Sequence, residues 1–590
     1  MKRFTADFET ATWIKDETWV WAWGLCDIEE PEKVEVGNSI ESFFERIKKE
    51  NNPYIYFHNL KFDGEFIIYY LLKNGFEWVE TQERRDNTFS TLISDMGLFY
   101  QIEVYFKVDK KKTKKVTFID SLKIINQSVE SMPKTFNIPE NKLSIDYNKP
   151  REKGHILTEE EEAYLKNDVI IPAKALGFLF NMGLTKMTAG SNALSEYKNI
   201  ITINKFRSMF KPLSYEIDKD IRRSYRGGFT YCNPEYKGKE TGEGITLDVN
   251  SLYPSIMRYE MLAFGEPFFF EGEYQEDKVY PLYIQRLTCS FKIKEGKIPT
   301  IQIKHSRFVD NEYLTDSGIE PVALTLTSVD LKLFLEQYDV WDLHYESGWK
   351  FKAMRGLFNQ YIDKWVELKN EATKTGNKGL RAICKILLNS LYGKFATSLD
   401  VQSKIPYLED DIVRYKLGEK ETKDGVYLPM GAFITAYARE RTIRTSQAIK
   451  DYSMKKYGKD LYCYSDTDSI TTLLSIEEVK QFCDIDDIRL GAWKHEHNHN
   501  GISFRRAKFI RQKTYLKEIW NDKINDWEIQ ITCAGLPQNC YDQVTWENFK
   551  EGLKVNGKLN FHHVKGGVIL VPTEFTIKED KILINAINKF

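Results

Sequence analysis

The stretch YCYSDTDSITTL, residues 462–473, places two aspartates between runs of β-forming residues. Asp466 and Asp468 stand two apart, so their carboxylates can lie on the same face of a hairpin-like segment. Read alone, the stretch is equally typical of a surface turn, because Asp and Ser are common turn residues. A matching acidic strand elsewhere in the chain would favour a metal site.

Such a strand is expected in GITLDVNSLYPSIM, residues 244–257, where an apolar run ends at Asp248 and Val249. An SLYPS turn follows, and its proline blocks continuation of the strand. One carboxylate from each of two adjacent strands is sufficient to place two metal ions for nucleotidyl transfer. We therefore assign Asp248 and Asp468 as ligands, the Val249 carbonyl as a further ligand, and Asp466 to the edge of the site.

A polar stripe lies between these two motifs, in a strongly helical segment from residue 357 to residue 396. Its members follow steps of three and four along one expected helix that ends at Gly393, and they are Lys374, Lys378, Arg381, Lys385, Asn389 and Tyr392. A solvated charged face explains Lys374 and Lys378. The later cations run into Asn389 and Tyr392, an order that suits the phosphates and then the base of an incoming nucleotide.

A second acidic group is expected in an N-terminal α/β region that extends to about residue 188. In TADFETAT, residues 5–12, Asp7 and Glu9 project from one strand face. Asp63 in YFHNLKFDGEF and Asp168 in AYLKNDV bring the number of carboxylates to four. Tyr164 precedes Asp168 by one helical turn.

Phosphodiester hydrolysis by two metal ions needs this kind of inventory, with carboxylates for the ions and a hydroxyl that orients the attacking water. We assign to Tyr164 the role of orienting the attacking water, and to Lys142 in NKLSIDY the role of holding a phosphate oxygen. Each residue also has a plainer reading. Tyr164 can be an aromatic side chain packed on the core, Lys142 a solvated loop lysine, and a lone DxE pair a solvated strand face.

The composition limits the class of protein. With 590 residues and 42% apolar content, the chain is long enough for several domains of about 100–200 residues each. Eight scattered cysteines without a CxxC pair, and no leader sequence, predict a reduced, cytoplasmic protein. No apolar run approaches the roughly 20 residues that span a bilayer. The net charge of -2 does not exclude a nucleic-acid partner, because acidic metal sites and basic grooves cancel in the sum.

Six motifs, taken in order, resemble those of the family B DNA polymerases, and most closely the protein-primed branch of small Bacillus-type phages, the phi-twenty-nine type. DFET, HNLKFDG and YLKND are similar to the three exonuclease motifs. DVNSLYPS, KILLNSLYGKF and YSDTDS are similar to polymerase motifs A, B and C. SYRGGF resembles the YxGG element that couples the two sites in this family, and RQKTY resembles its KxY motif, with Lys513 and Tyr515 expected on one strand face.

The resemblance implies an α/β and α+β multidomain fold, in which a ribonuclease H-like 3'-5' exonuclease domain precedes a right-hand polymerase with two insertions. The implied parts are the exonuclease domain (1–188), the first part of the palm (189–260), terminal-protein region 1 (261–360), the fingers (361–396), terminal-protein region 2 (397–428), the second part of the palm (429–533), and the thumb with a C-terminal tail (534–590).

The same resemblance implies further contacts. Tyr253 would stack under the nucleotide sugar and exclude a 2'-hydroxyl. A single-stranded 3' end would be held by Thr10, His58, Asn59, Phe62, Ser121 and Leu122. Further DNA contacts are implied for Tyr225, Gly227, Gly228, Phe229, Lys513 and Tyr515.

The expected protein is a monomeric, DNA-directed DNA polymerase with proofreading, protein-primed, processive and strand-displacing. It would use two Mg²⁺ ions per active site, with Mn²⁺ as a substitute. Its partners would be primer-template DNA, deoxynucleoside triphosphates and a terminal priming protein. Two alternatives stay open, a non-catalytic DNA-binding scaffold and an enzyme that makes RNA or copies it.

Some segments depart from the pattern or allow two readings. The chain from Lys369 to Arg381 is longer than usual for the family, which leaves Lys369 doubtful as a phosphate ligand. His495, His497 and His499 invite a zinc site but lack a fourth ligand. The lysine run 107–115 reads as a solvated hairpin tip, whereas the basic run 505–513 favours duplex binding. The tail 581–590 has no assigned role.

Overall fold

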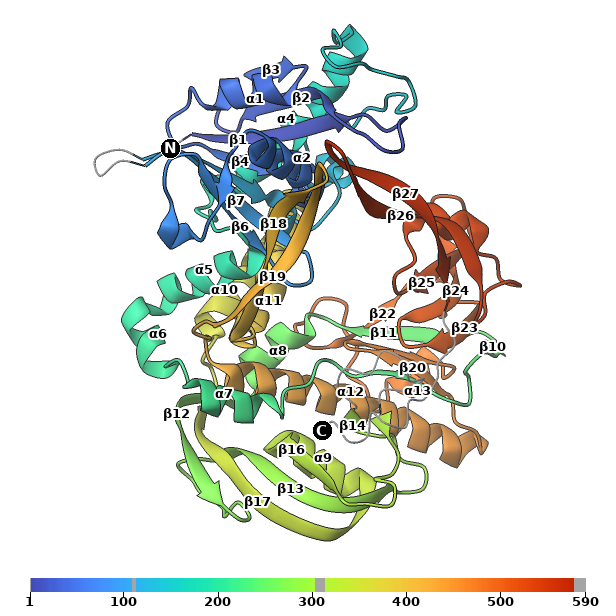
Figure 1. Cartoon of the computed structure of the whole chain (residues 1–590). Helices are drawn as coiled ribbons and strands as arrows, with labels where there is room; N and C mark the ends of the chain where they lie inside the picture. The colour runs from blue at the N-terminus through green and yellow to red at the C-terminus, as the bar shows by residue number, and fades with distance from the viewer. Residues whose placement is uncertain (1, 109–112, 303–312, 578–590) are drawn as a thin grey trace.

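The N-terminal part folds around an eight-stranded mixed sheet (Figure 1). The computed structural model describes residues 2–108, 113–302 and 313–577. The strand order is β3-β2-β1-β4-β8-β7-β6-β5. Their bounds are Arg3–Thr10 (β1), Val20–Asp27 (β2), Val34–Gly37 (β3), Tyr54–Phe57 (β4), Glu77–Trp78 (β5), Thr88–Ile93 (β6), Phe99–Lys107 (β7) and Lys114–Asp120 (β8).

Helices cover this sheet, and α4 (Glu159–Asn181) packs on β1 to β3. The sequence predicts a helix that begins around Thr158, and α4 begins there because Thr158 and Glu161 form a capping box at its N-terminus. The expected N-terminal α/β region is confirmed. The remaining helices of the first half are α1 (Ile40–Ile47), α2 (Leu60–Lys73), α3 (Met132–Phe136), α5 (Ala189–Ile201), α6 (Ile203–Met209) and α7 (Tyr215–Arg222), with short 3-10 turns at Thr81–Glu83, Ser121–Lys123 and Val129–Ser131.

A five-stranded antiparallel sheet forms the centre of the molecule, in the order β22-β11-β21-β20-β9. Its strands are β9 (Thr230–Cys232), β11 (Ile245–Val249), β20 (Tyr462–Asp466), β21 (Ser469–Thr472) and β22 (Trp493–Glu496), and the helices that follow or cover them are α8 (Leu252–Tyr259), α12 (Leu428–Tyr457) and α13 (Ile476–Val479). The expected SLYPS turn is corrected, because only Ser251 lies in a turn and Leu252 to Ser255 already belong to α8.

The sequence after residue 424 favours short strands through the C-terminus, and the structure corrects this for the first part of the segment. The segment begins with the 30-residue helix α12, which packs against β20 and β21. Its first three turns, from Leu428 to Ala438, are buried on nearly every side. Such a helix lacks the polar face that produces a helical period in the sequence, so the pattern does not reveal it.

Two further sheets flank the centre. A four-stranded sheet beside it consists of β10 (Glu240–Thr241), β23 (Arg506–Arg511), β24 (Thr514–Asn521) and β25 (Asp526–Cys533), and a 3-10 turn lies at Gln538–Gln543. The strand-rich hundred residues after α8 form a second four-stranded sheet below α12 in Figure 1, built from β12 (Leu262–Glu271), β17 (Tyr338–Met354), β13 (Leu282–Ile293) and β16 (Val322–Thr327), with α9 (Ser328–Gln337) and the small pair β14 (Ile301–Gln302) and β15 (Tyr313–Leu314).

The helical segment 357–396 is a pair of helices, α10 (Asn359–Lys374) and α11 (Lys378–Phe395), that pack against each other. The single predicted helix is therefore corrected. Gly376 adopts a φ of 70°, which ends α10 and reverses the chain. Lys374 consequently lies on α10 and does not continue the stripe of α11, and α11 passes Gly393 and ends at Phe395.

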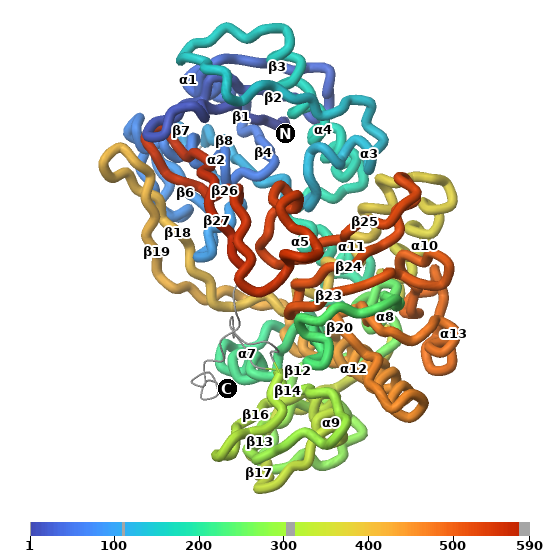
Figure 2. Tube along the Cα trace, turned by 90° about the vertical axis from the view of Figure 1, so that its right-hand side faces the viewer, coloured from blue at the N-terminus to red at the C-terminus, as the bar shows by residue number. Residues whose placement is uncertain are grey.

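Two long hairpins rise from the lower part of the molecule to the N-terminal domain, as Figures 1 and 2 show in gold and red. They are β18 (Asp400–Glu409) with β19 (Ile412–Thr422), and β26 (Lys554–Val564) with β27 (Gly567–Thr576). The first forms much of the predicted insertion 397–428. Its strands twist into a hairpin, where the sequence indicates only a turn-rich segment.

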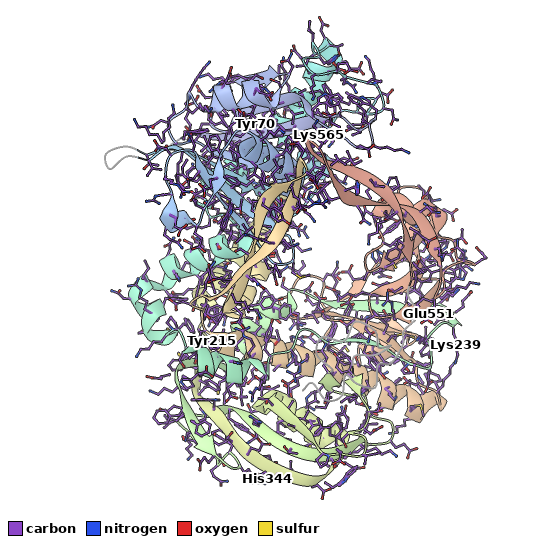
Figure 3. All side chains as sticks on the ribbon, viewed as in Figure 1. Tyr70, Tyr215, Lys239, His344, Glu551 and Lys565 are labelled. Atoms are coloured by element: carbon purple, nitrogen blue, oxygen red, sulfur yellow. The ribbon has the colours of Figure 1, made fainter. Side chains whose placement is uncertain are left out.

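The tips of both hairpins contact α2 and each other, which closes a ring of protein. Tyr415 of β19 donates a hydrogen bond of 2.7 Å to Glu65 of α2, and His563 of β26 lies 3.2 Å from the same carboxylate. At the tips, Asp411 forms an ion pair with Lys73 and lies 4.0 Å from Lys565. Lys565 and Tyr70 of α2 line one cavity at this junction, near the top of Figure 3. We call this set of contacts the ring closure.

Two expectations from the composition can be compared with the described residues. All eight cysteines are buried as free thiols. Among the described residues, no helix combines the length and apolar character needed to cross a bilayer. The tail 581–590 and residues 109–112 of the lysine run lie outside the described residues.

Candidate functional site

The first acidic site forms at the end of β1. The structure brings Asp7 and Glu9 of β1 together with Asp168 of α4, so that one oxygen from each carboxylate lies within 4.8 Å of the others. Asp63 of α2 completes the group by accepting a hydrogen bond of 3.2 Å from the Phe8 backbone N–H. The end of the interior strand β1, helix α2 and the capped helix α4 thus place all four predicted carboxylates in one group.

Electrostatics in this pocket oppose full ionisation. Burial, and then the neighbouring Asp168, raises the pKa of Asp7 to about 8. Burial and the other carboxylates also raise the pKa of Glu9 and of Asp63 well above their ordinary values. Asp168 has a buried oxygen, Oδ1, without a hydrogen-bond partner among the described residues. A cluster of hard oxygen donors with this excess of negative charge fits Mg²⁺ or Mn²⁺.

Two predicted accessory residues lie beside the four carboxylates. The Lys142 ammonium is 3.6 Å from the Asp168 carboxylate, and the Tyr164 hydroxyl is 2.8 Å from that of Tyr147. Tyr164 is nearly fully buried, and this burial, together with Glu9, raises the pKa of its hydroxyl. The phenol therefore stays protonated, as a residue that orients a water molecule requires.

The residues predicted to hold the single strand differ in exposure and in contacts. Asn59 is exposed, Phe62 is half-buried, and the Phe62 ring lies 6.1 Å from that of Phe561 on the β26–β27 hairpin. His58 and Ser121 instead hydrogen-bond each other at 3.0 Å. The remaining pair are Thr10, which is buried at the end of β1, and Leu122, which faces a cavity of about 530 Å³.

The second acidic site forms on the central sheet. Asp248 of β11 lies opposite Ser469 of β21 on one side and Lys494 of β22 on the other. Asp468 lies in the β20–β21 turn, and its carbonyl accepts a hydrogen bond of 2.8 Å from the Val249 backbone N–H. Burial and the neighbouring Asp468 raise the pKa of Asp248 to about 7, and burial also raises that of Asp468. These carboxylates likewise need nearby positive charge to ionise together.

Asp466 has a different environment from Asp468. It accepts hydrogen bonds of 2.9 and 3.1 Å from the Lys513 ammonium and one of 3.1 Å from the Thr230 hydroxyl. The expectation that Lys513 and Tyr515 share a strand face is wrong. Lys513 occupies the β23–β24 turn with a φ of 54°, where a two-residue hairpin requires left-handed backbone, and Tyr515 packs beside Tyr464 at 5.1 Å.

Helix α11 presents the predicted nucleotide contacts toward this site. Arg381, Lys385 and Asn389 are exposed on one face, four residues apart. The positive charge of Lys385 reaches both Asp248 and Asp468, where it opposes the rise of their pKa values. Lys369 of α10 joins this group, since its pKa is lowered by burial and then by the neighbouring Arg381 and Lys385. Arg381, Lys385 and Lys369 thus form a cationic group suited to a triphosphate, and the charge of Lys385 acts on both aspartates.

An aromatic pair forms the floor beside these groups. The Tyr253 ring of α8 stacks on Tyr392 of α11, with centroids 4.0 Å apart and an interplanar angle of 27°. The cavity of about 530 Å³ that Leu122 faces is lined on its other side by Lys385 and Asn389. This cavity therefore lies between the N-terminal domain and α11.

The SYRGGF loop lies directly against the acidic turn. A Cβ atom on Gly228 would lie 2.7 Å from the Thr467 side chain, so only glycine fits there. The Phe229 carbonyl accepts a hydrogen bond of 2.7 Å from the Thr467 backbone N–H, and Arg439 donates to the Gly227 carbonyl at 2.8 Å. Tyr225 is half-buried beside them.

Several residues at these sites are absent from the sequence predictions. Lys494 and Glu496 come to the Asp248 strand through the register of β22, and Glu496 raises the pKa of Asp248 after burial and Asp468. Asp120 accepts backbone hydrogen bonds from Asn59 and Leu122. Alternation along KHEH could have indicated Lys494 and Glu496, but nothing in the sequence indicates which strand they pair with. His495 faces away from them, and the histidines do not form a metal cluster among the described residues.

Comparisons with known proteins agree with this architecture. A family model described as DNA polymerase type B, organellar and viral, matches residues 44–156 and 144–484. The DNA polymerase of Bacillus phage phi29 is 44% identical over 98% of this chain and 99% of its own length. The polymerase of Streptococcus phage Cp-1 is 31% identical over 98% of this chain and 99% of its own.

The solved structures extend the likeness to three dimensions. The phi29 DNA polymerase in complex with primer-template DNA and incoming nucleotide substrates has a TM-score of 0.90 and 43% sequence identity, over 98% of this chain and 100% of that one. The phi29 polymerase complexed with single-stranded DNA has a TM-score of 0.89 over the same share of both chains.

Proposed function

The chain belongs to the family B DNA polymerases, in their phi29-type, protein-primed branch, and from this membership we propose how it divides synthesis and proofreading between its two acidic sites. The protein is a DNA polymerase of this type. In our proposal the central site extends a primer, and the N-terminal site removes nucleotides from a single-stranded 3' end. The observation that carries it is the presence of two separate carboxylate clusters, each with cationic or phenolic groups beside it.

At the central site, Asp248 and Asp468 would hold the catalytic Mg²⁺ ions, with the Val249 carbonyl beside them. Bound divalent ions supply Lewis acidity that activates the primer hydroxyl and neutralises the triphosphate. The chain's own residues supply binding and orientation. Arg381, Lys385 and Lys369 contact the phosphates, and the stacked pair of Tyr253 and Tyr392 supports the sugar and base.

At the N-terminal site, Asp7, Glu9, Asp63 and Asp168 would hold a second pair of ions, with Mn²⁺ able to replace Mg²⁺. Tyr164 keeps its proton and orients the attacking water, while Lys142 holds a phosphate oxygen. Asn59, Phe62 and Leu122 direct the strand. In our proposal the 3' end passes between the two sites through the cavity that Leu122 and Lys385 line.

The insertions carry the finer part of the proposal. The sheet built from β12, β13, β16 and β17 would receive a terminal protein whose hydroxyl primes synthesis. The two hairpins would encircle DNA through the ring closure, which favours processive, strand-displacing synthesis. A deoxynucleotide linked covalently to a co-expressed partner protein would support priming by protein, and labelling that needs a DNA primer in every case would contradict it.

Complementary substitutions separate the two activities. Asp468→Ala should reduce primer extension by about 10³-fold or more, because a metal ligand contributes several kcal/mol to the transition state. The variant should still shift primer-template DNA in a gel. Asp7→Ala should abolish degradation of a single-stranded 3' end and leave extension intact.

Asp522→Ala, which removes an exposed carboxylate outside both sites, is the matched control and should retain both activities. Primer extension by Asp468→Ala at the rate of the unsubstituted protein would contradict the assignment. That result would instead favour a non-catalytic DNA-binding role for this site.

A further inference from the structure

Lys517 is a buried lysine for which the proposed mechanism has no use so far. Its side chain extends from β24 into the central sheet and is only 5% exposed. The ammonium donates hydrogen bonds of 2.8 Å to the Thr246 hydroxyl and 2.9 Å to the Thr471 hydroxyl. Within the described parts of the chain, no carboxylate lies within ion-pair distance of it, and burial lowers the pKa of Lys517 to about 7.

The two threonines place Lys517 beside the catalytic carboxylates. Thr246 of β11 and Thr471 of β21 are partners across the antiparallel ladder, and the next pair on the same face is Asp248 with Ser469. Side chains two apart on a strand share a face and lie about 7 Å apart. The ammonium therefore joins β11 to β21 one residue pair away from Asp248, immediately below the turn that carries Asp468.

Strand β24 and the turn before it contact the acidic hairpin at three positions. Lys513 of the turn reaches Asp466, and the Tyr515 ring of β24 packs on Tyr464. Lys517 lies two residues after Tyr515 on the same face of β24, and its hydrogen bonds reach both β11 and β21. It lies over the Phe504 and Tyr515 rings at 5.5 and 5.1 Å, which partly compensates its burial.

Stability alone does not account for a lysine here. A buried charge without a carboxylate partner costs free energy, and an apolar side chain of similar volume is often as stable or more so. What an apolar side chain would lack is the pair of directional bonds across the ladder. These bonds fix the separation and register of the two strands that carry the ligands.

We propose that Lys517 is a positioning residue for nucleotidyl transfer, which fixes Asp248 relative to Asp468 by holding Thr246 and Thr471 together. This inference rests on the proposed role of the two aspartates. It assigns to the four-stranded sheet a part in arranging the metal site, in addition to any contact with the primer.

The test compares Lys517→Met with Lys517→Gln in the full-length protein. Met fills the space of the lysine but donates no hydrogen bond. If Asp248 is then misplaced by about 1 Å relative to Asp468, kcat for primer extension should fall by about 10- to 100-fold. The Mg²⁺ concentration that gives the half-maximal rate should rise. Gln retains a donor and should recover most of kcat. Degradation of a single-stranded 3' end, which uses the other site, should stay within about twofold in both variants.

Two further variants distinguish positioning from loss of stability. Thr246→Val combined with Thr471→Val removes the acceptors and should reproduce the effect of Lys517→Met. Lys450→Met removes a lysine that lies 3.1 Å from the buried Asp460, away from both sites. It should lower the melting temperature but leave kcat and the Mg²⁺ requirement unchanged.

Thermal unfolding across pH provides an independent readout. Because the pKa of Lys517 is lower in the folded protein than in the unfolded chain, its burial penalty is fully present below pH 7 and is lost as the pH rises toward the ordinary lysine value of 10.5. Lys517→Met should therefore melt at a temperature equal to or above that of the unsubstituted protein at pH 6–7. This advantage should shrink by pH 10.

The inference would be overturned if kcat and the Mg²⁺ dependence of Lys517→Met stayed within twofold of those of the unsubstituted protein. It would also be overturned if the melting temperature and both activities of this variant fell together. If Asp468→Ala is inactive while Lys517→Met is fully active, only the positioning role fails. If Asp468→Ala still extends primers, the proposed function itself fails.

Discussion

The stacked tyrosines at the floor of the central site give single residues a part in choosing the substrate. The ring centroids of Tyr253 and Tyr392 lie 4.0 Å apart, and burial raises the pKa of the Tyr253 hydroxyl. The Tyr253 side chain therefore stays neutral and is held in place by the stacking. A rigid ring under the sugar leaves no space for a 2'-hydroxyl in our proposal. This is the point at which a DNA polymerase and an enzyme that makes RNA would differ.

We predict that Tyr253→Val relaxes sugar selection. Removing the ring opens space at the sugar, so incorporation of ribonucleotides relative to deoxynucleotides should rise by about 10-fold or more, given about 1–3 kcal/mol for a steric contact of this size. Competition between rNTPs and dNTPs on one primer-template measures the ratio. Equal use of both sugars by the unsubstituted protein would contradict the role of Tyr253.

The carboxylates that we assign to the metal ions could be proposed from the sequence, because a DxE pair on a strand, a DTD turn between strands and an i,i+4 pair on a helix are local patterns. The residues that surround these carboxylates could not be predicted from the sequence. Glu496 reaches the Asp248 strand through the pairing of β22 with β11, and Lys517 bonds Thr246 from a strand of another sheet, in both cases across more than two hundred residues. Pairing register of that kind depends on the packed sheet and leaves no local signal.

Whole elements were predicted where their sequence is periodic and missed where burial is uniform. The capped helix α4 begins at the expected position, whereas α12, buried on nearly every side at its start, shows no period. The two helices α10 and α11 read as one, since a single glycine in left-handed conformation separates them. The hairpin β18–β19 was hidden because its charged, half-exposed strands lack strict alternation.

The tip of the β26–β27 hairpin gives a prediction for one element. Gly566 adopts a φ of 95°, and a Cβ atom there would lie 1.8 Å from the Thr18 carbonyl. The neighbouring Lys565 carbonyl accepts a hydrogen bond of 2.8 Å from the Thr18 backbone N–H. Gly566→Ala should therefore push the hairpin off the N-terminal domain and shorten the DNA made per binding event.

Gly552→Ala is the matched control, since Gly552 also has a positive φ, of 81°, but open space around it. Both alanines carry about 1–2 kcal/mol of left-handed strain, whereas only Gly566→Ala breaks the ring closure. Each 1.4 kcal/mol lost there reduces the closed population tenfold relative to the open one. The length of products made with a competitor DNA trap measures the effect. Equal lengths for both variants would mean that the hairpin tip does not retain DNA.

At the scale of the molecule, the ring closure joins segments from the two ends and the middle of the chain. Glu65, Tyr415 and His563 meet although they are separated by up to about five hundred residues. No pattern in the sequence marks such a junction, and the overall charge of -2 conceals both the acidic pockets and the basic faces. The order of parts along the chain was nonetheless predictable, because each motif is local and their sequence is that of one family.

Our central claim is that two separate acidic pockets bind divalent cations, one for synthesis and one for trimming. Anomalous diffraction from a crystal soaked in Mn²⁺ tests it most directly. We predict peaks at two places, one among Asp7, Glu9 and Asp168 and the other between Asp248 and Asp468. A map with metal at only one of these pockets, or with Asp248 remote from Asp468, would contradict the claim.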